Sequence, residues 1–98
     1  MHTIYAVEFD WDPAKARENI RIHGIDFADA VQVFANPHLA REDPDAEGEQ
    51  RFMTLGMDDL GRVLVVVYTY RPGKIRVISA RKASKKEGKE YARRVRFQ

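Results

Sequence analysis

The stretch from Arg62 to Tyr70 constrains the fold of this 98-residue chain more than any other segment. As a β-strand it would be apolar on both faces, with Val63, Val65 and Val67 on one and Leu64, Val66 and Tyr68 on the other. A strand of this kind must be covered on both sides, so it belongs at the centre of a sheet. We expect the rest of the chain to be arranged around it.

Four further strands are predicted from alternating or continuous apolar residues bounded by turn-forming residues. They cover residues 4–9, 38–41, 50–57 and 75–81. Tight turns at 58–61 and 71–74 join the last three strands of the chain into hairpins. The acidic segment at 42–48 is expected to be a solvent-exposed loop.

Three helices have recognisable start signals. Asp12 is a good N-cap for a helix that ends before Gly24, and Asp26 caps a second, short helix. Ser84 and Glu87 form the capping box of a third helix. The apolar residues of the second helix have helical spacing: Phe27, Ala30, Val31 and Phe34. The order predicts an α+β domain, an antiparallel β-meander sheet with two N-terminal helices and one C-terminal helix.

Size and composition predict one domain over residues 1–98. The chain contains no cysteine, which excludes disulfides, thiol catalysis and cysteine-bound metals. The first residues lack the pattern of a signal peptide, and the longest apolar run, 63–67, is too short to cross a bilayer. We therefore expect a soluble, cytoplasmic protein without a membrane partner.

Charge is divided unevenly along the chain. Residues 1–60 hold 5 Lys/Arg and 13 Asp/Glu, for a net charge of −8, whereas residues 61–98 hold 12 Lys/Arg and 2 Asp/Glu, for a net charge of +10. Such an asymmetry indicates an anionic partner at the basic end. The alternative is a solvated basic helix and tail without a ligand.

A polar stripe lies along the first helix. Lys15, Asn19 and His23 have i, i+4, i+8 spacing, and Ala16 and Ile20 are the expected core contacts of the same helix. The stripe could hold a phosphate and move a proton, because histidine titrates near neutrality. The alternative is a solvated helix face. His2 and His38 are weaker candidates, and no metal site is expected.

Arginines occur in or beside the last three strands, where a guanidinium fork can match phosphate oxygens. Arg81 is the strongest candidate, because strand alternation puts it on the same face as Ile75, Val77 and Ser79. An arginine beside an apolar face needs an anion, which could be Glu8, Glu49 or a ligand. The other arginines are Arg51, Arg71 and Arg76, and the last helix adds Lys85, Lys86 and Lys89. The residues alone indicate a small domain that binds a polyanion.

Two blocks of the sequence follow a known pattern. The first comprises residues 9–15, Asn19 and residues 23–27. The second comprises Arg51-Phe52, Leu55-Gly56, residues 64–69, residues 75–84, Glu87 and Tyr91. Together they resemble the BrnT-type toxins of type II toxin–antitoxin systems, over about residues 4–91 of this chain.

The resemblance implies a RelE-like α+β ribonuclease that inhibits translation by cutting RNA. It also implies a cognate antitoxin with a ribbon-helix-helix domain. The toxin–antitoxin complex would contact operator DNA only through this antitoxin. By position, the polar motif residues of the family fall here on Lys15, Asn19, His23, Arg51, Arg71, Arg76, Arg81 and Ser84. The family often has Thr-Glu-Arg where this chain has Thr69-Tyr70-Arg71. If that glutamate is the general base, Glu49 or His23 must replace it here.

RNA cleavage without a metal or another cofactor needs an acid, a base and cations beside the phosphate. The expected catalytic residues are His23, Glu49, Arg51, Arg71 and Arg81, and the expected RNA-binding residues are Lys15, Asn19, Arg76, Lys82, Ser84, Lys85 and Lys86. RNA and antitoxin are expected to compete for the face formed by Arg76, Arg81, Lys82, Lys85 and Lys86. The alternative is a non-catalytic module that binds nucleic acid or antitoxin.

Overall fold

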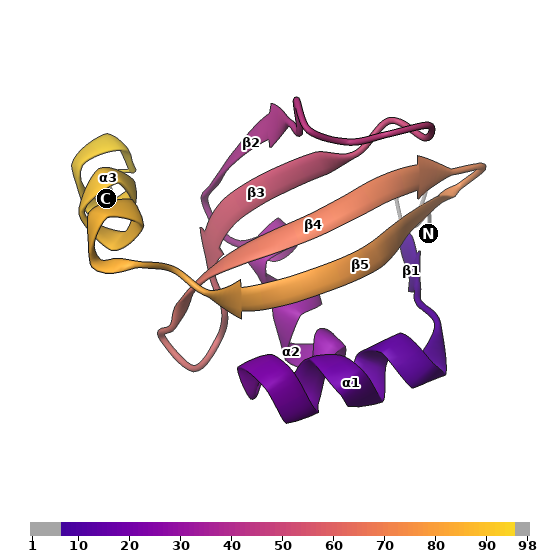
Figure 1. Cartoon of the computed structure of the whole chain (residues 1–98). Helices are drawn as coiled ribbons and strands as arrows, with labels where there is room; N and C mark the ends of the chain where they lie inside the picture. The colour runs from indigo at the N-terminus through magenta and orange to yellow at the C-terminus, as the bar shows by residue number, and fades with distance from the viewer. Residues whose placement is uncertain (1–6, 96–98) are drawn as a thin grey trace, which may run out of the picture.

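A five-stranded sheet forms the centre of the computed structural model, which describes residues 7–95 (Figure 1). The strand order is β1-β5-β4-β3-β2, so the strand that is apolar on both faces occupies the middle, as its sequence predicts. The strands are β1 (Glu8–Asp10), β2 (His38–Glu42), β3 (Phe52–Met57), β4 (Val63–Arg71) and β5 (Lys74–Lys82).

The sheet is mixed rather than wholly antiparallel. Strands β2 to β5 pair antiparallel in sequence order, whereas β1 pairs in parallel with β5. The expected antiparallel sheet is therefore wrong at this edge. The physical reason is that no hairpin joins β1 to β5, so no turn imposes an antiparallel direction. Residues 4–6 of the expected first strand lie outside the described residues.

The helices begin where the sequence predicts. Helix α1 (Pro13–His23) is capped by the Asp12 side chain and ends at Gly24 with a φ of 71°. Asp26 caps α2 (Phe27–Ala30), and both reciprocal bonds of the Ser84–Glu87 capping box precede α3 (Lys85–Arg94). Figure 1 shows α1 and α2 beneath the sheet and α3 beyond the end of β5.

The hydrophobic core lies between the sheet and the first two helices. We call the side of the sheet that bears Leu64 and Val66 the core face and the opposite side the outer face. The core residues come from β4, β5 and the segment 25–33 that follows α1: Ile25, Phe27, Ala30, Val33, Leu64, Val66, Val77 and Ala80. Ala16 packs against this cluster as expected, but Ile20 is 45% exposed, which contradicts its expected place in the core.

The second helical segment changes geometry part-way. After α2 the chain continues as a 3₁₀-helix, η1 (Val31–Ala35). Three residues per turn bring Phe27, Ala30 and Val33 to the same side, and all three are fully buried. The α-helical spacing of Phe27, Ala30, Val31 and Phe34 does not identify Val33 as a core residue.

A β-bulge changes which way Arg81 points. Val67 pairs with Ser79 and Tyr68 pairs with Val77, so Ile78 is an extra residue in β5. The bulge interrupts the alternation of β5 side chains between the two faces of the sheet. Arg81 therefore pairs with Val65 and points to the outer face, whereas Val77 points to the core face. The predicted placement of Arg81 on the face of Ile75 and Val77 is therefore wrong.

Candidate functional site

Arg81 is held at the end of β5 by the first turn of α3. Its Nη1 and Nη2 donate to Glu87 Oε1 and Oε2 at 2.8 and 3.0 Å, and Nη1 also donates to the Lys82 carbonyl at 3.2 Å. The sequence predicted that Arg81 binds Glu8, Glu49 or a ligand, and the internal carboxylate beside it is instead Glu87. The Arg81 guanidinium lowers the pKa of Glu87 to about 2, and hydrogen bonding to Glu87 in turn raises the pKa of Arg81.

Part of the Arg81 fork is still available to a ligand. A guanidinium has five N–H donors, and Glu87 and Lys82 together take three of them. The remaining donors, on Nε and Nη2, lie along one edge of the planar group, and 42% of the side chain is exposed. Such an edge can make two parallel hydrogen bonds to a phosphate. Glu87 therefore orients Arg81 without occupying all of its donors.

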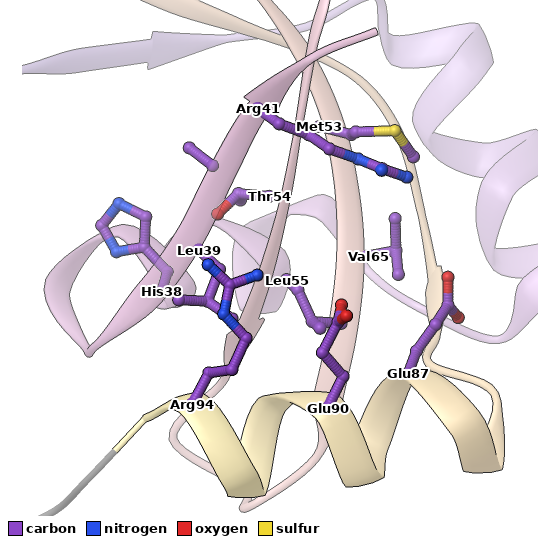
Figure 2. Close-up of a pocket in the computed structure, with 11 residues that line it drawn as sticks. His38, Leu39, Arg41, Met53, Thr54, Leu55, Val65, Glu87, Glu90 and Arg94 are labelled. Atoms are coloured by element: carbon purple, nitrogen blue, oxygen red, sulfur yellow. The ribbon is translucent and has the colours of Figure 1, made fainter.

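A pocket of about 450 Å³ separates α3 from the outer face of the sheet. Figure 2 shows Glu87, Glu90 and Arg94 rising from α3 toward the strands, while the His38 ring points away from them. We call this cavity the inner pocket. Its lining comprises His38, Leu39, Ala40, Arg41, Met53, Thr54, Leu55, Val65, Glu87, Glu90 and Arg94.

A second hollow, the basic groove, runs along α3 beside the inner pocket, with which it shares Arg41, Glu87 and Glu90. Its lining comprises Arg41, Arg81, Ser84, Lys85, Lys86, Glu87, Lys89, Glu90 and Arg93. Basic side chains outnumber acidic ones by six to two in this set. A concave surface with this excess of positive charge attracts polyanions.

The structure brings together one part of the expected site and separates the rest. Arg81, Ser84, Lys85 and Lys86 share the basic groove. Lys82 is exposed but follows Arg81 in β5, so its side chain points to the opposite face. Arg76 lies farther along β5, where it is bonded to Asp10 at 3.2 Å.

The expected catalytic set does not converge. Arg71 is bonded to Glu49 at the far end of β4. Arg81 pairs with Val65 of the same strand, and the rise of a β-strand places Val65 about 20 Å from Arg71. Arg51 precedes β3 and is half-buried, and its Nε has no hydrogen-bond partner among the described residues. One phosphate therefore cannot contact Arg51, Arg71 and Arg81 together, and Glu49 is too far from Arg81 to act beside it.

The three residues of the polar stripe on α1 lie in different environments. Asn19 is 94% buried, and its amide bonds the backbone of Ile25 and Ala80. The donors and the acceptor of the Asn19 amide are thus used inside the fold, which gives Asn19 a structural role in place of the predicted RNA contact. Lys15 and His23 are exposed, but they belong to a helix on the core face, across the sheet from the inner pocket.

Sequence reasoning missed Arg41 and Glu90. Arg41 sits on an edge strand whose register with β3 could not be known in advance, but that register puts it opposite Met53. Glu90 could have been found from the last helix, because Glu87, Glu90, Tyr91 and Arg94 follow i, i+3, i+4, i+7 spacing. Tyr91 anchors this side of the helix: it is 99% buried and donates to the Pro37 carbonyl at 2.8 Å.

We expect the Arg81–Glu87 pair to make stability depend on pH in the acid range. The pKa of Glu87 is about 2 in the folded protein, below its ordinary value of 4.5, so its stabilising effect is complete above about pH 4.5 and is lost as pH falls toward 2. Glu87→Gln should therefore lower the melting temperature at pH 7 but match the wild type near pH 2. Glu47→Gln, in the exposed acidic loop, is the matched control. An equal difference at both pH values would contradict the assignment.

The described residues, 7–95, contain no group of three or more His, Asp or Glu side chains placed to hold a metal ion. No helix within them is long and apolar enough to cross a membrane.

Comparison with known proteins identifies the family. The family model described as "Ribonuclease toxin, BrnT, of type II toxin-antitoxin system" matches residues 11–87. The chain belongs to this family. The resemblance seen in the sequence is thus confirmed, and the matched BrnT segment includes Arg81, Ser84 and Glu87 but ends before Glu90 and Arg94.

A solved BrnT structure has a similar fold. It is the 1.1 Å crystal structure of the Brucella abortus ribonuclease toxin, BrnT, with a TM-score of 0.62 and 28% sequence identity. The alignment covers 82% of this chain and 100% of that chain. A search of curated proteins found no match to this sequence.

Proposed function

We propose that this BrnT-family chain is a RelE-like, metal-independent endoribonuclease that inhibits translation in the cytoplasm by cutting RNA. The observation that carries the proposal is the free edge of Arg81, held by Glu87 in a groove with five other basic side chains. Membership of a ribonuclease toxin family supports RNA as the polyanion.

The scissile phosphate binds at the free edge of Arg81. Negative charge builds up on the phosphoryl oxygens as the 2′-oxygen attacks, and a preoriented donor pair stabilises that charge without further rearrangement. Lys85 and Lys86 lie in the first turn of α3 and neutralise neighbouring phosphates. Arg51, Arg71 and Arg76 lie farther along the sheet, so in this proposal they contact flanking phosphates rather than the reacting one.

The experiment that tests metal independence is cleavage of end-labelled RNA with and without EDTA. We expect the same products at the same rate in both reactions, because the basic side chains take the role that a metal ion has in other nucleases. Activity that EDTA abolishes and Mg²⁺ restores would overturn this mechanism. Binding of RNA without cleavage under any condition would favour the alternative, a non-catalytic module that binds nucleic acid or antitoxin.

A cognate antitoxin, proposed to carry a ribbon-helix-helix domain for operator DNA, neutralises the toxin by covering the basic groove. An acidic segment that occupies Arg81, Lys85 and Lys86 would remove the phosphate-binding groups directly. We expect labelled RNA to be displaced as antitoxin is added, measured by fluorescence anisotropy. An antitoxin complex that binds RNA with undiminished affinity would mean that blockade occurs at a distant surface.

A further inference from the structure

We propose that Glu90 is the general base of the cleavage reaction and takes the proton from the attacking 2′-hydroxyl of the RNA. This assignment rests on the proposed ribonuclease function and deepens it. Neither the sequence motif nor the matched family segment includes Glu90, since that match ends at residue 87.

Glu90 is an uncommitted carboxylate. Glu87, one turn earlier on α3, is bonded to Arg81 and to the Ser84 backbone N–H. Glu90 makes no ion pair or hydrogen bond within residues 7–95. A carboxylate needs free lone pairs to accept a proton from a substrate. Three hydrogen bonds occupy most of the lone-pair sites of Glu87, whereas those of Glu90 are open within residues 7–95.

The position of Glu90 matches the geometry that a base requires. It lines both the inner pocket and the basic groove, so it stands where the two cavities meet. Figure 2 shows its carboxylate directed at the strands, between Glu87 and Arg94. A phosphate on Arg81 in the basic groove would therefore lie on one side of Glu90, and the inner pocket on the other.

The inner pocket can hold the nucleoside whose 2′-hydroxyl reacts. Leu39, Met53, Leu55 and Val65 form an apolar floor on the outer face, and apolar surface is suited to the face of a nucleobase. The volume of about 450 Å³ is within the range of small-ligand sites. Arg41 and Arg94 also line the pocket and have no ion-pair partner among the described residues, which leaves them free for phosphate.

The proposed step is balanced without a metal or a redox partner. The 2′-hydroxyl proton passes to the Glu90 carboxylate as the bond from the 2′-oxygen to phosphorus forms. The bond from phosphorus to the 5′-oxygen breaks, and that oxygen takes a proton from water. Glu90 then returns its proton to the hydroxide that is left. The products are a 2′,3′-cyclic phosphate and a free 5′-hydroxyl.

The test compares Glu90→Gln with Glu47→Gln, a matched change in the acidic loop. Glutamine keeps the shape of the side chain but cannot accept the proton, so we expect single-turnover cleavage to fall by about 10²–10⁴-fold. RNA affinity and melting temperature should stay near wild-type values, because Glu90 has no hydrogen-bond or ion-pair partner to lose among residues 7–95. Glu47→Gln should change neither cleavage nor binding.

The pH–rate profile separates a base from a merely structural residue. Wild-type cleavage should rise tenfold per pH unit at acid pH, and Glu90→Gln should lack that slope. The titratable and charged groups that line the two cavities with Glu90 come from three elements: His38 and Arg41 from β2, Arg81 from β5, and Lys85, Lys86, Glu87, Lys89, Arg93 and Arg94 from α3. The residues of β3 and β4 in these linings carry no charge. Arginines stay protonated throughout this range, and Glu87→Gln serves as a second control for the slope.

Each outcome decides a different point. Full activity and an unchanged acid slope in Glu90→Gln would overturn the role of Glu90 and leave the ribonuclease function intact. Wild-type products that end in a 5′-phosphate would also overturn it. A wild-type protein that cuts none of the RNAs tested would instead remove the proposed function, and the assignment of Glu90 with it.

Discussion

Arg81→Ala is expected to slow RNA cleavage by about 10²–10³-fold, the usual effect of removing one preoriented donor from a site of developing negative charge. The loss should appear in kcat as well as in kcat/KM, because the interaction strengthens as charge builds up on the phosphate. Arg81→Lys should recover part of the binding but little of the rate, since an ammonium group lacks the two-donor edge.

The same change should leave the fold intact. The Arg81–Glu87 pair is partly exposed, and such pairs contribute about 1 kcal/mol or less to stability. The control is Arg21→Ala, which breaks the exposed Arg21–Glu18 pair on α1 without touching the groove. Thermal unfolding measures the fold, and single-turnover cleavage measures the chemistry. If the Arg81→Ala protein loses its cooperative thermal unfolding, the role of Arg81 is that of a structural ion-pair residue instead.

Local signals predicted much of the fold. Side-chain caps at Asp12, Asp26 and Ser84 need no knowledge of tertiary contacts, and all three helices begin where these residues indicate. The central position of β4 also followed from its own residues. The parallel pairing of β1 did not, because it depends on a contact between β1 and β5, which are far apart in the sequence.

The site was predicted less well, because its geometry depends on register and on tertiary contacts. One extra residue in β5, Ile78, reverses the face of Arg81, and no local pattern marks that bulge. Arg71 and Arg81 stand at opposite ends of the β4–β5 hairpin, and the predicted turn at 71–74 already implied this separation. The basic charge of the last helix was evident, whereas the cavity beneath it depends on the tertiary contact by which Tyr91 of α3 is buried and bonded to the Pro37 carbonyl.

Asn19→Ala is expected to destabilise the protein by about 3 kcal/mol, with the melting temperature falling by more than about 10 °C. The Asn19 amide donates to the carbonyls of Ile25 and Ala80 at 2.8 Å and accepts from the Ala80 N–H at 3.1 Å. Alanine leaves these buried backbone groups without partners, and each unsatisfied group costs about 1–3 kcal/mol. Urea unfolding measures the loss, with Lys15→Ala on the exposed side of α1 as control.

This experiment also decides between two roles for the polar stripe. Asn19→Asp can still accept from Ala80 N–H but puts a carboxylate against two carbonyl oxygens, so it should be at least as unstable as Asn19→Ala. A residue that contacts RNA would behave differently: its loss would weaken cleavage at unchanged stability. Because Ala80 immediately precedes Arg81, Asn19 acts on the site by holding the end of β5 in place. Activity per folded molecule should therefore fall much less in Asn19→Ala than in Arg81→Ala.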